Sequence, residues 1–208
     1  MVGVGRRTLL AAVAVLALAG CNKDGGSGGG GGGKAETGPM VMGSPGAKVA
    51  MVEYLSVTCS HCARFNSAVF PQFKAKYIDT GKVSYEQREI LTPPSQVAAA
   101  GFLLARCAGK DKYFAVVDSI LNSQEDMFRS NDFRGGLLRI AQSTGMSEDQ
   151  FESCVSDKQA LAALNARVEK AARDDNISST PTFVINGKKY EGEQSMEQLD
   201  AIIQPLLK

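Results

Sequence analysis

The residues best suited to chemistry are two cysteines, Cys59 and Cys62, separated by Ser60 and His61. An apolar run over residues 49–55 precedes them, and an amphipathic pattern typical of a helix follows them. The pattern predicts a strand, a short turn and a helix, with Cys59 at the helix N-terminus. Two intervening residues in the first helical turn bring the two sulfurs close enough to form a disulfide. The spacing therefore predicts a redox-active pair.

The expected helix start favours a thiolate at Cys59. Free backbone N–H groups and the positive end of the helix dipole both stabilise a negative charge there. Cysteines in such settings have pKa values of about 3.5–7.5, compared with about 8.5 for a free thiol. We therefore assign Cys59 as the attacking thiol and Cys62 as the resolving thiol. His61 is the single histidine of the chain, and when charged it is expected to stabilise the Cys59 thiolate further.

Two other roles are compatible with a Cys-x-x-Cys pair, namely half of a zinc site or an inert structural disulfide. A zinc site needs two further ligands at close spacing, and the sequence has neither a second Cys-x-x-Cys nor a pair of histidines. The redox pair is therefore the favoured interpretation, with no metal site predicted. Outside this motif, His61 would be an ordinary surface histidine.

The chain has 208 residues, enough for one domain with its own core and an additional segment. Its 23 basic and 22 acidic residues give a formal net charge of +1, and no long basic run is present, so nothing points to nucleic acid. The cysteines number five, which is odd for an exported protein and requires an explanation. They are Cys21, Cys59, Cys62, Cys107 and Cys154.

The first twenty residues have the pattern of a bacterial lipoprotein signal peptide. Two arginines, Arg6 and Arg7, precede an apolar stretch over residues 8–19, which is too short to span a bilayer as a helix. Small residues then precede Cys21, as in a lipobox, so Cys21 is the predicted lipid attachment site. An ordinary signal peptide or an uncleaved anchor is the alternative, and a twin-arginine signal fits poorly. Each route takes the protein out of the cytoplasm and into an environment in which disulfides persist.

Residues 21–47 are expected to be a flexible tether, and the folded domain is expected over residues 48–208. Eight glycines and one serine fill residues 25–33, a composition that behaves as a random coil with a reach of roughly 28 Å for the whole tether. The glycines carry no phosphate-loop pattern, so we assign them no chemistry.

Strand and helix patterns alternate along the folded part. A strand over residues 48–56 is followed by a helix over 63–79, which Pro71 in its interior is expected to kink, and then by a strand over 82–91. The Thr180-Pro181-Thr182 segment precedes a strand, an Asn-Gly hairpin turn and a last helix over 195–207. Between these lies a block with helical periodicity, with helices expected over residues 96–108, 112–123, 132–143, 148–156 and 158–174. Ser147, with Gln150 three residues later, predicts a capping box at the start of the fourth of these helices.

A carboxylate, Glu53, interrupts the first apolar strand. Burying it is costly unless it has a partner or a task. It is either exposed at a sheet edge or a buried acid with a raised pKa that accepts the Cys62 proton. In the helical block, Cys107 and Cys154 are left over, which suggests a second disulfide. Its loop of 47 positions would add at most about 4 kcal/mol of stability, and two free buried thiols are the alternative.

Two motifs in this order resemble the DsbA family of exported bacterial thiol–disulfide oxidoreductases. The first runs from Val52 to Cys62, the second from Thr180 to Gly187, and the likeness covers about residues 48–208. The resemblance implies an α/β, thioredoxin-like fold. Its central mixed sheet would be flanked by helices and interrupted by an all-helical subdomain over about residues 95–176.

The resemblance also implies site residues. Pro181 falls on the family's cis-proline beside the disulfide, Thr180 on the residue whose backbone contacts a client strand, and Ser60 lies in the client-facing dipeptide. A cis bond is chemically reasonable there, because only X–Pro bonds adopt it at modest cost. Ser60 stands where the best-known members have proline, and this position influences the redox potential. The family's buried glutamate and its second cysteine pair fall on Glu53, Cys107 and Cys154.

Together these features predict a membrane-tethered oxidoreductase that forms or exchanges disulfides in exported proteins through Cys59 and Cys62. The expected partners are cysteine-containing clients, a membrane redox partner that restores the disulfide, and the membrane itself through Cys21. We predict no cofactor and no nucleic acid. The predicted location is the bacterial cell envelope, facing the periplasm, on the inner or outer membrane. The same chemistry run as reductase or isomerase is one alternative. A Cu(I)-binding lipoprotein is another, against which the lack of a Met or His cluster argues.

Overall fold

The computed structural model of the protein describes residues 1–3 and 33–208. The predicted signal peptide beyond its first three residues, the lipid attachment site Cys21 and the tether up to residue 32 lie outside the described residues. Within the described part of the chain, no helix combines the length and apolarity needed to cross a membrane.

A five-stranded sheet in the order β1-β3-β2-β4-β5 forms the centre of the domain. Strands β2 and β3 pair in parallel, and the other neighbouring pairs are antiparallel. The mixed sheet flanked by helices confirms the expected thioredoxin-like class with a helical insertion. The strands are β1 (Met40–Met42), β2 (Val49–Leu55), β3 (Val83–Glu89), β4 (Thr182–Ile185) and β5 (Lys188–Glu191).

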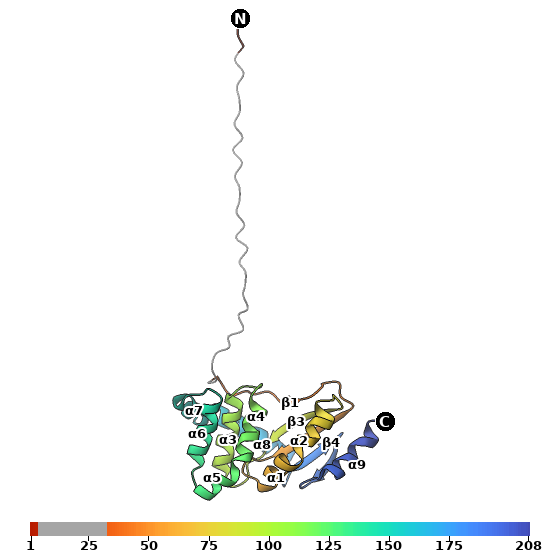
Figure 1. Ribbon diagram of the computed structural model, residues 1–208. Coiled ribbons are helices and arrows are strands. Elements are labelled where there is room, and N and C mark those ends of the chain that lie inside the picture. Colours follow the sequence, from red (N-terminus) through yellow and green to blue (C-terminus); the bar gives the residue numbers. More distant parts are fainter. Residues whose placement is uncertain (4–32) are drawn as a thin grey trace.

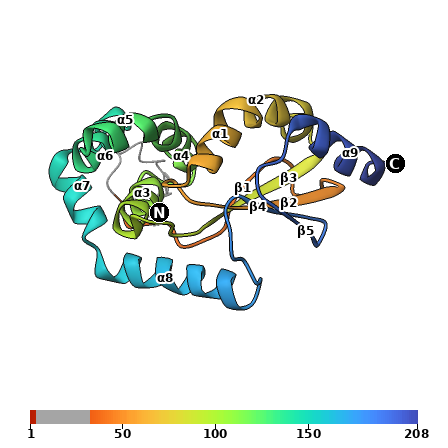
Figure 2. The same cartoon turned by 90° about the horizontal axis from the view of Figure 1, so that it is seen from below.

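Helices cover both faces of this sheet (Figure 2). One face packs against α1 (Ser60–Ala68), α2 (Phe70–Phe73) and α9 (Met196–Leu206), where aromatic and aliphatic side chains form a core. The other face carries α8 (Lys158–Arg173), whose Ala171 packs with Tyr54 of β2. The helical insertion gathers at one end of the sheet (Figure 1). Its other helices are α3 (Ser95–Cys107), α4 (Tyr113–Asn122), α5 (Gln124–Ser130), α6 (Phe133–Ser143) and α7 (Glu148–Val155).

The continuous helix expected over residues 63–79 is divided into three segments. Helix α1 ends before Val69, α2 follows with Pro71 in its first turn, and a π-helical turn, η1 (Lys74–Ile78), completes the stretch. Proline has no N–H to continue the ladder and its ring crowds the preceding turn, so the chain restarts the helix at that point. The sequence predicted the kink and placed the helix start three residues too late.

The turns and caps read from the sequence are present. Asn186 and Gly187 both have positive φ, 45° and 83°, as the two-residue hairpin turn requires. Ser147 and Gln150 form the predicted capping box at α7. A second capping box at α9, formed by Ser195 with the N3 glutamine, and the short helix α5 were not anticipated.

The tether boundary expected at residue 47 is too late. Residues Met40–Met42 form strand β1 on the free edge of β3, and Met40 is buried. The Glu36 N–H also donates to the Arg106 carbonyl at 3.2 Å. An exposed strand edge gains stability from a pairing segment, and three residues are too few to show a period in the sequence.

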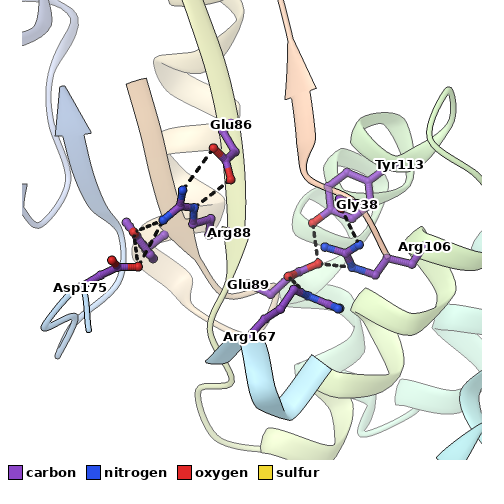
Figure 3. A network of polar contacts seen from close by, with 9 residues as sticks. Gly38, Glu86, Arg88, Glu89, Arg106, Tyr113, Arg167 and Asp175 are labelled. Atoms are coloured by element: carbon purple, nitrogen blue, oxygen red, sulfur yellow. Dashed lines mark hydrogen bonds and ion pairs between the residues drawn. The ribbon is translucent and has the colours of Figure 1, made fainter. Parts of the chain in front are cut away.

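A buried carboxylate joins the sheet to the insertion. Glu89, at the end of β3, has 2% of its surface exposed. The guanidinium of Arg106 donates to it, as does Arg167 Nε at 3.2 Å and the Tyr113 hydroxyl at 3.4 Å. Figure 3 shows these groups converging from α3, α4 and α8. Arg106 also donates to the Gly38 carbonyl at 3.1 Å, so the N-terminal segment is fastened at the same point.

This cluster predicts a large and specific effect of Glu89→Gln on stability. The change leaves buried Arg106 without its countercharge, and breaking a buried pair in this way costs about 3–5 kcal/mol. Urea unfolding followed by circular dichroism measures the loss. Glu86→Gln, on the same strand but in a partly exposed pair with Arg88, is the control and should cost about 0–1 kcal/mol. Equal losses for both variants would contradict the account.

Candidate active site

The turn between β2 and α1 carries the cysteine pair as the sequence predicts. Cys59 is the N-cap of α1, with extended backbone angles of φ −89° and ψ 119°. Its N–H donates to the Ser56 carbonyl and its own carbonyl accepts from the Ala63 N–H, both at 3.1 Å. The side chain of Cys59 therefore lies where the first turn of α1 presents unpaired N–H groups.

The Cys59 thiol is partly buried and its pKa is lowered from 9.0 to about 5. The largest cause is the hydrogen bond from the Cys62 side chain. The Thr180 side chain and the backbone N–H groups of Cys62 and His61 add to it, while burial opposes the shift. At neutral pH this sulfur is a thiolate, which is the reactive form.

Cys62 behaves in the opposite way. It is fully buried, and burial raises the pKa of its thiol well above 9.0. Its hydrogen bond to Cys59 and the negative charges of Cys59 and Glu53 raise this pKa further. Cys62 therefore keeps its proton and serves as the donor that stabilises the Cys59 thiolate. The opposed shifts of the two pKa values agree with the predicted roles of Cys59 as the attacking thiol and Cys62 as the resolving thiol.

Glu53 is buried, with 2% of its surface exposed, and does not lie at a sheet edge. Burial raises its pKa from 4.5 to about 7, the Tyr85 hydroxyl opposes this by donating a hydrogen bond, and the Cys59 charge adds to it. The Tyr85 oxygen also accepts from Gln87 Nε2 at 3.1 Å. Because the folded pKa lies above the unfolded one, the contribution of Glu53 to the free energy of unfolding falls as pH rises from 4.5 to about 7. At neutral pH this carboxyl can both accept and release a proton.

The His61 ring lies in a polar cluster on the surface. The Arg64 guanidinium contacts Nδ1, and a Glu193 carboxylate oxygen lies 3.5 Å from the same atom. The His61 side chain is 59% exposed. Its contribution to the Cys59 thiolate comes from the backbone N–H. The expected contribution of the charged ring to the thiolate stays a prediction, and the contacts of the ring in this structure are with Arg64 and Glu193.

The loop before β4 lies against the cysteine pair. The Thr180 carbonyl oxygen is 3.3 Å from Cys59 Sγ, and the Thr180–Pro181 peptide bond is cis. Thr180 remains partly exposed beside the sulfur, whereas Pro181 is buried. Residues about 120 positions apart in the chain are thus neighbours, as the resemblance implied. A second cis bond, Pro93–Pro94, was not anticipated.

A cavity of about 920 Å³ opens beside the turn, between α1 and the helical insertion. Ser60 and Arg64 line it from α1, and Gln124 and the 43% exposed Phe128 line it from α5. Ser60 is therefore placed on a concave surface next to Cys59, which is compatible with its expected role in client binding. Sequence reasoning missed the α5 side of this cavity because it predicted no helix between residues 123 and 132.

The remaining cysteines lie away from this turn. Cys107 of α3 and Cys154 of α7 are joined by a disulfide, so of the two alternatives the structure has the bridge and not two free thiols. Cys59 and Cys62 are the free cysteines of the described residues. Within that part of the chain, no group of three or more His, Cys, Asp or Glu residues is arranged to hold a metal ion.

Comparisons with known proteins agree with this geometry. Residues 35–205 match the family model described as thioredoxin. A Rickettsia bellii protein named as a protein-disulfide oxidoreductase is 34% identical over 171 residues, 82% of this chain and 65% of the relative. The crystal structure of Wolbachia pipientis alpha-DsbA1 is similar, with 28% identity, a TM-score of 0.75, and coverage of 84% of this chain and 93% of that one.

Another relative is the disulfide bond formation protein D of Bacillus subtilis. It is 26% identical over 82% of this chain and 78% of its own length. The chain spans only 65%, 62% and 58% of the first three Rickettsia relatives that it matches.

The Cys59 environment predicts an acid-shifted titration that depends on Cys62. In the reduced protein, thiolate absorbance at 240 nm should rise with a midpoint near pH 5. Cys62→Ala removes the main donor and should move the midpoint up by at least about one pH unit, whereas Cys62→Ser keeps a hydroxyl donor and should move it less. A wild-type midpoint near 9, or identical midpoints in the three proteins, would contradict the assignment.

Proposed function

The chain belongs to the DsbA-like members of the thioredoxin family, and on this basis we propose that it is a membrane-tethered thiol–disulfide oxidoreductase that forms disulfides in exported proteins. The observation that carries the proposal is the pair of opposed pKa values at one helix start. Cys59 is a thiolate near neutral pH, and Cys62 beside it is a buried thiol. Such a pair is suited to exchange with a client disulfide or dithiol.

In the oxidising direction the enzyme begins with a Cys59–Cys62 disulfide. A client thiolate attacks Cys59 Sγ, the intramolecular bond breaks, and Cys62 leaves and takes up a proton. A second client thiolate then attacks the client sulfur of the mixed disulfide and releases Cys59 as a thiolate. The client loses two electrons and the enzyme gains them, so the client disulfide forms as the enzyme dithiol forms.

Glu53 is the residue suited to move the Cys62 proton. Its carboxyl is buried near that thiol, with a pKa of about 7, and its charge raises the Cys62 pKa. A neutral Glu53 gives its proton to the leaving Cys62 sulfur, and the carboxylate takes it back when the disulfide is restored. The Tyr85 hydroxyl, which donates to Glu53, keeps the carboxylate form within reach of neutral pH.

Oxidation is the favoured direction because ionisation of Cys59 stabilises the reduced enzyme. The thiolate exists only in that form, so the reduced protein gains stability over the oxidised one as pH rises above about 5. An enzyme whose dithiol form is stabilised in this way readily passes its disulfide to a client. The same residues working as reductase or isomerase remain the alternative, because partners and their potentials also determine direction.

The proposed client site is the exposed edge of the Thr180 loop. Thr180 is partly exposed next to the reactive sulfur, so an extended client segment can pair with its backbone as an added strand. Backbone pairing recognises an extended segment more than its sequence, so it suits varied cysteine-containing clients. Ser60 borders the cavity on the other side of Cys59. A membrane redox partner would use the same surface to restore the disulfide.

A trapping experiment tests the proposal. Cys62→Ala, with Cys59 first converted to a mixed disulfide with glutathione, should accumulate mixed disulfides with a reduced, unfolded, cysteine-containing client. The client thiolate displaces glutathione from Cys59, and the internal thiol that would resolve the new bond is absent. Cys59→Ala should form none. Non-reducing gels measure the complexes, and refolding of the client with oxidised wild-type protein measures turnover. If the wild type exchanges no disulfide with any client but binds Cu(I) tightly through both sulfurs, the metal-binding alternative holds.

The anchoring part of the proposal is that Cys21 carries lipid in the cell envelope. It rests on the lipobox pattern at residues 18–21, and two acyl chains anchor durably where one binds only marginally. Mass spectrometry of the mature N-terminus should find a lipidated Cys21, and Cys21→Ser should release the protein from membranes. A mature wild-type protein that begins at another residue and stays in the aqueous fraction would refute the tether.

A further inference from the structure

A glutamine of the helical insertion reaches the catalytic turn. Gln124 is the first residue of α5 and has 6% of its surface exposed. Its Nε2 donates to the Val57 carbonyl at 2.8 Å and to the Cys59 carbonyl at 3.2 Å. Both hydrogens of the amide are thus used on two carbonyls of the same turn. Among the described residues, no other side chain is hydrogen-bonded to either carbonyl.

These two carbonyls belong to the backbone that holds the reactive sulfur. The Cys59 carbonyl also accepts the first hydrogen bond of α1, from the Ala63 N–H. A carbonyl oxygen carries partial negative charge, which opposes a thiolate in the same residue. A donor on that oxygen offsets part of this charge and polarises the following peptide, whose N–H belongs to the helix start. The amide therefore favours the thiolate and fixes the turn at the same time.

We propose that Gln124 is a positioning residue for thiol–disulfide exchange: by bonding the Val57 and Cys59 carbonyls, it holds the turn in the geometry that stabilises the Cys59 thiolate. This inference rests on the proposed function. It gives the helical insertion a direct part in the redox chemistry of a cysteine pair that belongs to the thioredoxin core. The residue acts through the backbone and does not touch the client.

If the role of Gln124 were purely structural, a different result would be expected. Losing two hydrogen bonds to buried carbonyls would destabilise the fold, and it would do so equally in the oxidised and reduced proteins. The Cys59 pKa and the exchange equilibrium would then stay unchanged. A positioning role must change the balance between the two redox forms.

The test is Gln124→Met, which keeps the length of the side chain and removes both donors. We expect the 240 nm titration to place the Cys59 pKa higher by about 0.5, and the equilibrium constant for oxidising glutathione to fall about threefold in consequence. Gln124→Glu also removes the donors and adds a negative charge, so its changes should be in the same direction and larger at pH 7.

Ile140→Val is the control for stability. Ile140 is buried in the insertion core, and this change lowers stability by about 0.5–1.5 kcal/mol without removing a bond to the turn. Its Cys59 pKa and glutathione equilibrium should match the wild type. If Ile140→Val shifts both quantities as much as Gln124→Met, or if Gln124→Met shifts neither, the positioning role is overturned. Neither measurement uses a client, so a wild type that turns over no client refutes the proposed function separately.

Discussion

A single negative charge on Cys59, held at the start of α1, is the constraint on which the site depends. A half-buried sulfur ionises near pH 5 only if donors replace the water it has lost. The Cys62 thiol, the Thr180 side chain and the first N–H groups of the helix supply them. Because Cys62 must act as a donor, it has to keep its proton, and complete burial ensures this. The opposite protonation states of the two sulfurs therefore both follow from the need to stabilise the negative charge on Cys59.

Two buried carboxylates, Glu53 and Glu89, show that the surroundings of a carboxylate determine its role. Glu53 on β2 has a tyrosine hydroxyl as its side-chain partner, so burial leaves it able to change protonation near pH 7. Glu89 on the adjacent strand β3 is bonded to Arg106 and Arg167, so its charge is compensated and its task is to join the sheet to the insertion. The sheet thus carries the proposed proton-transfer group and a structural ion cluster on adjacent strands.

The helical insertion contacts the thioredoxin core at the end of β3, at α1 and at the catalytic turn. Its arginines fix the end of β3, as Figure 3 shows, and Asn66 of α1 donates to Asp118 of α4 at 2.8 Å. Gln124 extends this contact to the backbone of the catalytic turn. An insertion anchored in this way has a defined position relative to Cys59, so the cavity between them has a defined shape.

The sequence by itself determined the features that depend on near neighbours in the chain. The spacing of Cys59 and Cys62 predicted a dithiol at a helix start, Asn186-Gly187 predicted the hairpin, and Ser147 predicted a cap, because each depends on local backbone geometry. Only the tertiary structure decided that Tyr85 donates to Glu53, that the His61 ring lies in a polar cluster on the surface, that β1 pairs with β3, and that Gln124 bonds the turn. These contacts join residues far apart in the chain, so no local period or motif encodes them.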